Sequence, residues 1–263
     1  METLIYFFIF IIGTLFGSFF TLAVYRIPIK QSITHGRSYC PKCNHRLEFL
    51  DLIPVLSYIF IGGKCRYCKE KIRPRYIALE ILSGITFLLF AVSLRINLYN
   101  LEIFKLVYLV VGMLYLSTLF IIGGIEKEKH IISKPVFAFG LIIEILYIIY
   151  LYMLDINIYK HVIYLFLAIL FVLIMLVLEK KEKQSYTMQI LALCFCIAIF
   201  TMERITINTI ILTLLIIAIR QVTILSKKDK KNINDINEYK QIPIGFYLCV
   251  SNIIVLILRN YMF

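Results

Sequence analysis

The sequence predicts an all-α integral membrane protein with about eight transmembrane helices and a small zinc-binding loop domain in the cytoplasm. Hydrophobic residues make up 61% of the 263 residues, and the mean hydropathy is +0.87. Apolar runs long enough to span a bilayer, about 18 to 20 residues each, recur along the chain. Two Cys-x-x-Cys pairs lie in one polar, basic segment. These features exclude an ordinary soluble protein.

The apolar runs define the helices in order. The first, residues 4–24, is predicted to be a retained span, because Glu2 replaces a basic amino-terminal region and no small-residue cleavage site precedes Tyr25. Seven more follow at 76–94, 104–124, 135–153, 161–178, 188–202, 205–225 and 243–258. Only Glu203 and Arg204 separate the sixth run from the seventh. That short gap predicts a tight helical hairpin or one long broken helix.

The net charge of +12 comes from cations that gather in every second loop. Residues 25–75 carry 11 Lys and Arg, and further basic clusters follow at 127–134, 180–183 and 227–240. Because positively charged loops stay in the cytoplasm, the basic loops are predicted to be cytoplasmic and both termini outside. The chain then divides into a first span (1–24), a cytoplasmic loop (25–75) and seven further spans (76–263). The cations are expected to face the anionic lipid bilayer, and no nucleic-acid partner is predicted.

The cytoplasmic loop contains C-P-K-C and C-R-Y-C, with 21 residues between the two pairs. The four cysteines are Cys40, Cys43, Cys65 and Cys68. Four thiolates from two tight turns form a tetrahedral sulfur site that suits structural zinc. Two disulfides or four free thiols are the alternatives, and a reducing cytoplasm disfavours disulfides.

Further motifs surround these cysteines in a fixed order. They are G-S-F-F-T-L-A-V-Y-R-I-P at 17–28, S-Y-C-P-K-C-N-H at 38–45, L-D-L-I-P-V-L-S-Y at 50–58, G-K-C-R-Y-C at 63–68 and I-R-P-R-Y-I-A-L-E at 72–80. Together they resemble the amino-terminal half of the type IV prepilin peptidases. Near the other end, K-Q-I-P-I-G-F-Y-L at 240–248 is similar to the closing Ile-Pro-Phe-Gly-Pro segment of that family, with Phe246 in place of the last proline.

The resemblance implies an aspartic protease of the bacterial cytoplasmic (inner) membrane. Such an enzyme cuts the basic leader from type IV prepilins and pseudopilins at the cytoplasmic face. Many members also methylate the new amino terminus with S-adenosylmethionine. No glycine-rich cofactor turn follows a predicted strand here, so S-adenosylmethionine rests on the resemblance alone. Glu80 stands where the family also has a glutamate, and a salt bridge with Arg73 or Arg75 is the structural alternative.

Aspartic catalysis requires two carboxylates that face one water, one ionised and one protonated. The resemblance places Glu126 and Glu128 at the first family aspartate, one methylene longer than aspartate. A displacement of about 1 Å can cost on the order of a hundredfold in rate. Thr187 stands at the second aspartate, and a hydroxyl cannot replace a carboxylate as base. The nearest acids upstream are Glu179 and Glu182.

The sequence therefore predicts a prepilin leader peptidase-like protein whose catalytic acids, Glu126 and Glu128, are eroded. Whether it is an enzyme stays open. The alternative is an inactive homologue that binds pilin-like substrates, or an active peptidase paralogue, in pilus, secretion or competence assembly. A transporter is the third class considered, and it would need ionisable groups inside the spans. Glu144 is the main such group, and a helix-packing contact explains it as well.

Overall fold

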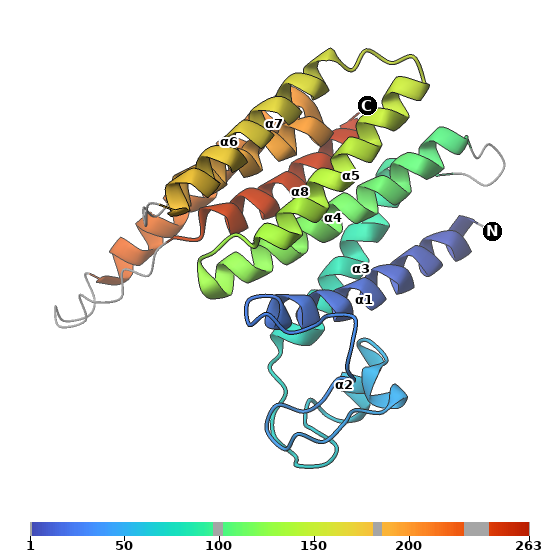
Figure 1. Cartoon of the computed structure of the whole chain (residues 1–263). Helices are drawn as coiled ribbons and strands as arrows, with labels where there is room; N and C mark the ends of the chain where they lie inside the picture. The colour runs from blue at the N-terminus through green and yellow to red at the C-terminus, as the bar shows by residue number, and fades with distance from the viewer. Residues whose placement is uncertain (1, 97–101, 181–185, 229–241, 263) are drawn as a thin grey trace. The chain divides into compact units, whose positions relative to one another are not determined.

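The computed structural model describes residues 2–96, 102–180, 186–228 and 242–262 (Figure 1). In these ranges the long elements are all α-helices, which confirms the predicted helical class. They are α1 (Glu2–Arg26), α2 (Leu56–Phe60), α3 (Arg75–Ser93), α4 (Ile103–Lys129), α5 (Lys134–Met153), α6 (Tyr159–Lys180), α7 (Tyr186–Lys228) and α8 (Ile244–Met262), with a 3-10 helix η1 (Phe49–Leu52). Extended pairing in the same ranges is limited to two isolated β-bridges.

Five of these helices, α1, α3, α4, α5 and α7, are long and apolar enough to cross a membrane. Two others, α6 and α8, carry the shorter apolar stretches Tyr159–Ile174 and Ile244–Leu258. A multi-pass membrane protein is therefore supported. Each of the eight apolar runs is helical, but eight separate spans are not confirmed. The reason is that the sixth and seventh runs share one helix.

The chain forms two compact units, Met1–Ile121 and Ile122–Phe263, with the boundary inside α4. In the first unit, α1 packs closely against α3. A Cβ on Gly13 would lie 2.8 Å from the Cα of Gly84, and a Cβ on Gly17 would lie 2.7 Å from the Cα of Glu80. The Ser83 hydroxyl also donates to the Gly13 carbonyl at 2.7 Å. Small residues at four-residue spacing allow this close approach, which places the two ends of the cysteine loop side by side.

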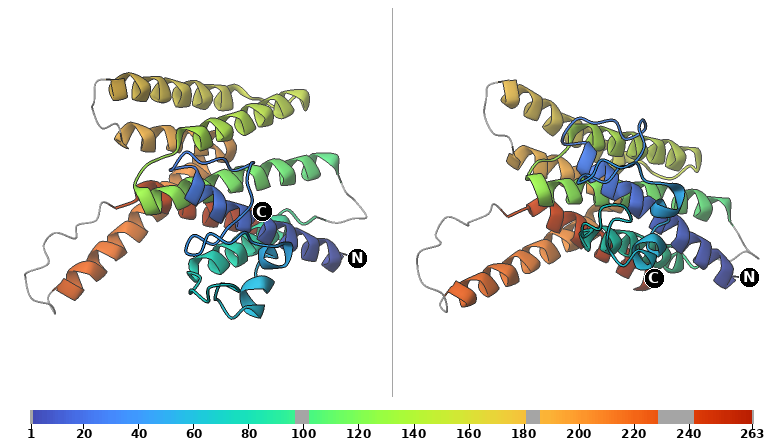
Figure 2. Two further views of the ribbon diagram at one scale, coloured as in Figure 1. Left: turned by 60° about the horizontal axis from the view of Figure 1, so that its bottom comes forward. Right: turned by 90° about the horizontal axis from the view of Figure 1, so that it is seen from below.

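The second unit contains the end of α4 and helices α5 to α8. Within it, α7 packs against α5, α6 and α8. Its helical path is interrupted at Met202, which has φ 62° and ψ 173°. The two parts of α7 leave this bend in different directions (Figure 2). The bend lies one residue before the predicted break at Glu203, and an ion pair between Lys160 and Glu203 ties it to the start of α6.

Candidate functional site

The four cysteines of the first unit converge on one point. Their Sγ atoms all lie within 4.8 Å of one another, and the Sγ atoms of Cys40 and Cys68 are 3.8 Å apart. Zinc–sulfur bonds of about 2.3 Å in a tetrahedron place the sulfurs about 3.8 Å apart. A disulfide would need about 2.05 Å, and all four residues are free cysteines. The arrangement fits one zinc ion bound by Cys40, Cys43, Cys65 and Cys68.

Two equivalent turns, residues 38–47 and 63–72, deliver these cysteines. In each turn the N–H of the first cysteine donates to the carbonyl five residues later. The residue four positions after the first cysteine donates its N–H to the carbonyl of that cysteine. The residue seven positions after the first cysteine donates its N–H to the carbonyl of the residue two positions before that cysteine. The pairs are Cys40–His45, Asn44–Cys40 and Leu47–Ser38 in the first turn (2.9, 2.8 and 2.8 Å), and Cys65–Glu70, Lys69–Cys65 and Ile72–Gly63 in the second (2.8, 3.0 and 2.8 Å).

The turns also share a backbone feature that the sequence analysis missed. The residue after each second cysteine, Asn44 or Lys69, has a left-handed backbone with φ 56° or 60°. The two ten-residue segments are thus an internal structural repeat. The signal for it was the shared C-x-x-C spacing, but the other positions differ in residue type.

The thiols influence one another's protonation. Burial raises the pKa of the Cys40 thiol, but hydrogen bonds from the backbone N–H groups of Cys43 and Lys42 outweigh it and lower the pKa to about 7. For Cys68, the backbone N–H of Glu70 lowers the pKa, but desolvation and the neighbouring thiols raise it to about 11. Thiols this close cannot all ionise without a cation between them, which is the condition that a divalent metal satisfies.

A second cluster forms in the other unit around Glu126, which is fully buried in the last turns of α4. Its Oε1 atom accepts hydrogen bonds from the Gly245 N–H at 2.9 Å and from the Tyr186 hydroxyl. The Tyr186 hydroxyl in turn accepts from the Ile244 N–H at 3.1 Å. We call these four residues the Glu126 cluster. It places a carboxylate at the amino-terminal end of α8, where the helix dipole favours negative charge.

Only glycine fits at position 245 while the Glu126 carboxylate keeps this position. A Cβ at position 245 would lie 3.0 Å from the Glu126 Cδ and closer still to one of its oxygens. The second oxygen, Oε2, is buried beside the start of α8 as well.

The structure separates the two predicted catalytic residues. Glu128 is exposed, whereas Glu126 is buried. Two residues along an α-helix correspond to a rotation of about 200°, so the two side chains leave α4 on different faces. Thr187, the residue aligned with the second aspartate, is exposed as well. The side chains of Glu179 and Glu182 lie outside the described residues.

Tyr186 is the cluster member that sequence reasoning missed. It directly precedes Thr187, so the resemblance pointed to the right segment and to the neighbouring residue. Which of two adjacent residues faces α4 depends on how α7 begins and packs. The I-P-I-G motif at 242–245 was identified, but its contact with Glu126 was not predicted.

Glu80 acts on the cysteine loop rather than on the Glu126 cluster. Its Oε2 atom accepts the Val55 N–H at 2.7 Å. Val55 has φ 63°, and a left-handed backbone is costly for a β-branched residue, of the order of 1–3 kcal/mol. The Glu80 carboxylate therefore helps to hold a strained turn between the two cysteine pairs.

Comparison with known proteins finds relatives of the first unit. Residues 11–94, which contain both cysteine turns, match the family model described as Bacterial Peptidase A24 N-terminal domain. The chain is 34% identical over 133 residues to the Prepilin leader peptidase/N-methyltransferase of Bacillus subtilis (51% of this chain, 50% of the relative). Proteins of the same name match from Klebsiella pneumoniae (30% over 131 residues; 48% and 54%) and Myxococcus xanthus (40% over 80 residues; 30% and 24%).

The chain thus spans about half, or less, of the length of these curated relatives. No solved structure matches it. The matched region contains the ordered motifs around the cysteines and the α1–α3 helix pair that supports them. Residues 11–94 are therefore similar to the amino-terminal domain of the bacterial A24 peptidases, and the relatives that match are prepilin leader peptidases.

Proposed function

We propose that this chain is a prepilin leader peptidase-like membrane protein that binds type IV prepilins or pseudopilins and has little or no leader-cleaving activity. The observation that carries the proposal is the set of partners of Glu126. Its carboxylate is bonded to a phenol and a backbone amide, where a two-carboxylate enzyme would present a second acid. The similarity to the relatives and their names support prepilins as the bound class.

The chemistry follows from these partners. In an aspartic mechanism two close carboxylates share one proton, so that one acts as base and the other as acid. Tyr186 supplies a hydroxyl that donates to Glu126, and a phenol does not take a proton from water near neutral pH. The hydrogen bonds to the Glu126 Oε1 atom come from a phenol and a backbone amide. We therefore expect Glu126 to hold a substrate N–H group or a water weakly, without efficient hydrolysis.

Orientation in the inner membrane is part of the proposal. The basic loops, including the cysteine loop, lie in the cytoplasm and both termini lie outside. The Glu126 cluster supports this arrangement within the second unit. It joins the end of α4 to the starts of α7 and α8. The three basic loops at 127–134, 180–183 and 227–240 adjoin these helix ends. If the three loops are all cytoplasmic, the three helix ends must lie on the same side of the membrane.

The two cofactors have unequal support. The four converging thiols support a structural zinc ion that keeps the two turns of the cysteine loop together. S-adenosylmethionine is supported only by the relatives' names, which include N-methyltransferase. The described residues contain no strand followed by a glycine-rich turn, so they supply no site that by itself indicates the methyl donor.

A cleavage assay tests the proposal. The purified full-length chain in detergent is incubated with a prepilin, alongside Glu126→Gln, Glu128→Gln and Thr187→Asp variants. We expect little cleavage by the parent chain and no gain for Thr187→Asp, because the exposed position 187 does not face Glu126. Rapid cleavage by the parent chain that Glu126→Gln or Glu128→Gln abolishes would show that the acid chemistry is intact.

The exposed apolar surface of the cysteine loop supports the binding part of this proposal. Phe49 of η1 and Phe60 of α2 are 82% and 83% exposed, although they lie outside the apolar helices. Large exposed apolar side chains on a rigid support mark interaction surfaces. Crosslinking to a prepilin that is reduced in a Phe60→Ser variant, with zinc content unchanged and no cleavage in any variant, would select this function.

A further inference from the structure

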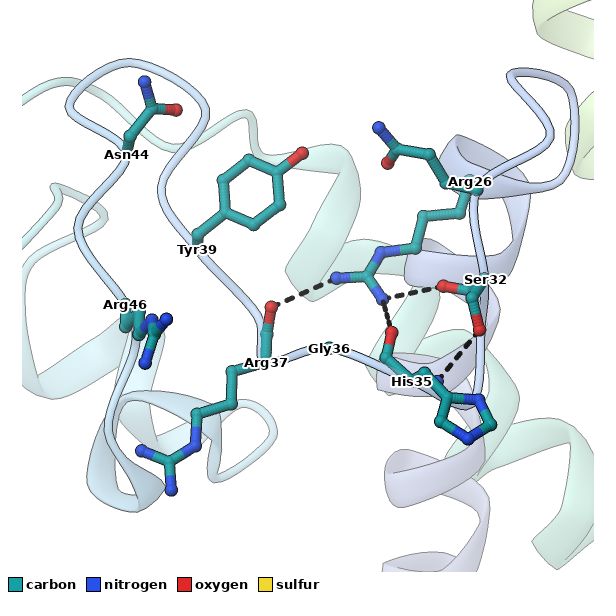
Figure 3. A pocket seen from close by; sticks show the side chains of 9 residues that line it. Arg26, Ser32, His35, Gly36, Arg37, Tyr39, Asn44 and Arg46 are labelled. Carbon is teal, nitrogen blue, oxygen red and sulfur yellow. Dashed lines mark hydrogen bonds between the residues drawn. The ribbon is translucent and has the colours of Figure 1, made fainter.

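A basic pocket in the first unit has no part in the functions proposed above. Its cavity of about 690 Å³ lies between the end of α1 and the segment that enters the first cysteine turn. Figure 3 shows Arg26 on one wall, and Arg37, Tyr39, Asn44 and Arg46 on the opposite wall. Three arginines and His35 contribute to the lining, and no carboxylate does.

Arg26 is the central group of this pocket. It is 6% exposed, so its charge is nearly removed from water. Its terminal nitrogens donate to the carbonyl oxygens of Ser32 (2.9 Å), His35 (3.5 Å) and Arg37 (3.2 Å). These bonds close the loop into a wall of the pocket (Figure 3), but they do not exhaust the N–H groups of a guanidinium.

The charge of Arg26 has no counter-ion among the described residues. Its hydrogen-bond partners are neutral carbonyls, and no described carboxylate forms an ion pair with Arg26, Arg37 or Arg46. A buried charge is normally paired, because removing it from water is costly. Two further arginines on the opposite wall raise the positive potential of the same cavity. An anion in the pocket would compensate all three.

The chemistry of the lining selects the class of anion. Guanidinium groups bind phosphate oxygens through paired N–H bonds, and they do so better than ammonium groups. Tyr39 and Asn44 add groups that can bond to hydroxyls. The volume falls within the range of about 300–1,000 Å³ that ligand pockets occupy and exceeds what one phosphate group fills. A glycerophosphate headgroup satisfies both the charge and the size.

The position of the pocket points to a lipid as the source of that headgroup. Arg26 is the last residue of α1, a candidate membrane span. Tyr25 and Ile29, on either side of it in sequence, have 44% and 45% of their side chains exposed. A cation at the end of a span, flanked by an exposed aromatic and an exposed aliphatic residue, is the arrangement found at the lipid headgroup level. We propose that this pocket binds the phosphate of an anionic phospholipid headgroup.

The test measures lipid binding to the purified full-length protein, with no prepilin present, so its result is independent of the cleavage assay. Short-chain phosphatidylglycerol, phosphatidylcholine, glycerol 3-phosphate and inorganic phosphate are titrated separately and in competition. The test variant is Arg37→Gln/Arg46→Gln, which leaves Arg26 and its loop contacts in place. The control is Lys64→Gln/Lys71→Gln, which removes the same charge from exposed positions of the same loop outside the pocket.

We expect phosphatidylglycerol to bind more tightly than phosphatidylcholine. The arginine pair variant should weaken phosphatidylglycerol binding by at least about tenfold, and the lysine pair variant by much less. Zinc content and thermal unfolding, measured on each variant, identify any that fail to fold. In that case the single variants Arg37→Gln and Arg46→Gln replace the double variant.

The competition arms separate the sources of phosphate. If glycerol 3-phosphate or inorganic phosphate displaces the lipid at a similar concentration, the pocket takes a soluble phosphate compound, and the lipid assignment is wrong. Equal binding of the two phospholipids, or equal losses in the arginine and lysine variants, would overturn the phosphate site itself. Tight binding of S-adenosylmethionine that the arginine variant abolishes would overturn it too, in favour of a methyl-donor site.

Discussion

At the scale of single residues, Gly245 and Glu126 determine each other. The carboxylate reaches the start of α8 only because position 245 lacks a side chain, and the Gly245 N–H then supplies one of its two bonds to Oε1. Glycine here is required by a close approach and not by an unusual backbone angle. Its role is therefore a steric one, which a single added methyl group can test.

We predict that Gly245→Ala lowers the thermal unfolding midpoint of the detergent-solubilised protein, by the equivalent of about 1–3 kcal/mol, because the methyl group collides with the carboxylate. Gly123→Ala is the matched control, since a Cβ there meets the Cys249 Cβ at an ordinary 3.4 Å. In an α-helix that change should be neutral or stabilising. Equal effects of the two changes would show that position 245 tolerates a side chain.

At the scale of elements, the cysteine loop depends on two supports, the sulfur cluster and the strained turn at Val55. The repeated hydrogen-bond pattern of residues 38–47 and 63–72 shapes each turn locally. A cation bound between the two turns would offset the charge of their thiolates and hold the turns together. Glu80, on the first turns of α3, stabilises the Val55 turn by accepting the Val55 N–H.

Metal analysis is the first test at this scale. We predict about one zinc ion per chain and its loss in Cys40→Ser, accompanied by faster hydrogen exchange in residues 38–72. The α1–α3 contact should keep its protection, because it rests on glycine packing. A chain without zinc, in which Cys40→Ser changes neither exchange nor unfolding, would contradict the zinc assignment.

The Val55 turn provides a second test. Glu80→Gln keeps an oxygen acceptor, whereas Glu80→Ala removes it from the Val55 N–H. We expect Glu80→Ala to speed the release of zinc to a chelator, and Glu80→Gln to do so less. Val55→Gly in the Glu80→Ala background should recover part of the loss, since glycine adopts the φ of 63° without strain. No recovery would mean that Glu80 acts through contacts other than this turn.

At the scale of the whole molecule, the order of basic and neutral loops predicts which helix ends face the cytoplasm. Asp155 follows α5 in a loop predicted to be outside, and Lys129 ends α4 on the side predicted to be cytoplasmic. In intact cells, a membrane-impermeant maleimide should label Asp155→Cys and spare Lys129→Cys. Both should react after the cells are opened. The reverse pattern would invert the proposed orientation of the chain.

The sequence by itself determined the helical class, the positions of the apolar helices, the four cysteines that cluster and the relatives of the amino-terminal region, because all of these are recorded in local patterns. Apolar runs, C-x-x-C spacing and ordered motifs need no knowledge of distant contacts. It also located the break in α7 to within one residue, since Glu203 and Arg204 interrupt the apolar run. The number of spans stayed open, because length and hydropathy alone do not say whether a bent helix crosses once or turns back.

Only the tertiary structure decided which acid lies in a site and what accompanies it. Glu126 meets Tyr186 across 60 residues of sequence and Gly245 across 119. Such contacts depend on how α4, α7 and α8 pack, and no local pattern distinguishes the buried Glu126 from the exposed Glu128 two residues on. The same holds for Arg26, whose buried guanidinium and basic pocket exist only because the following loop folds back over the end of α1.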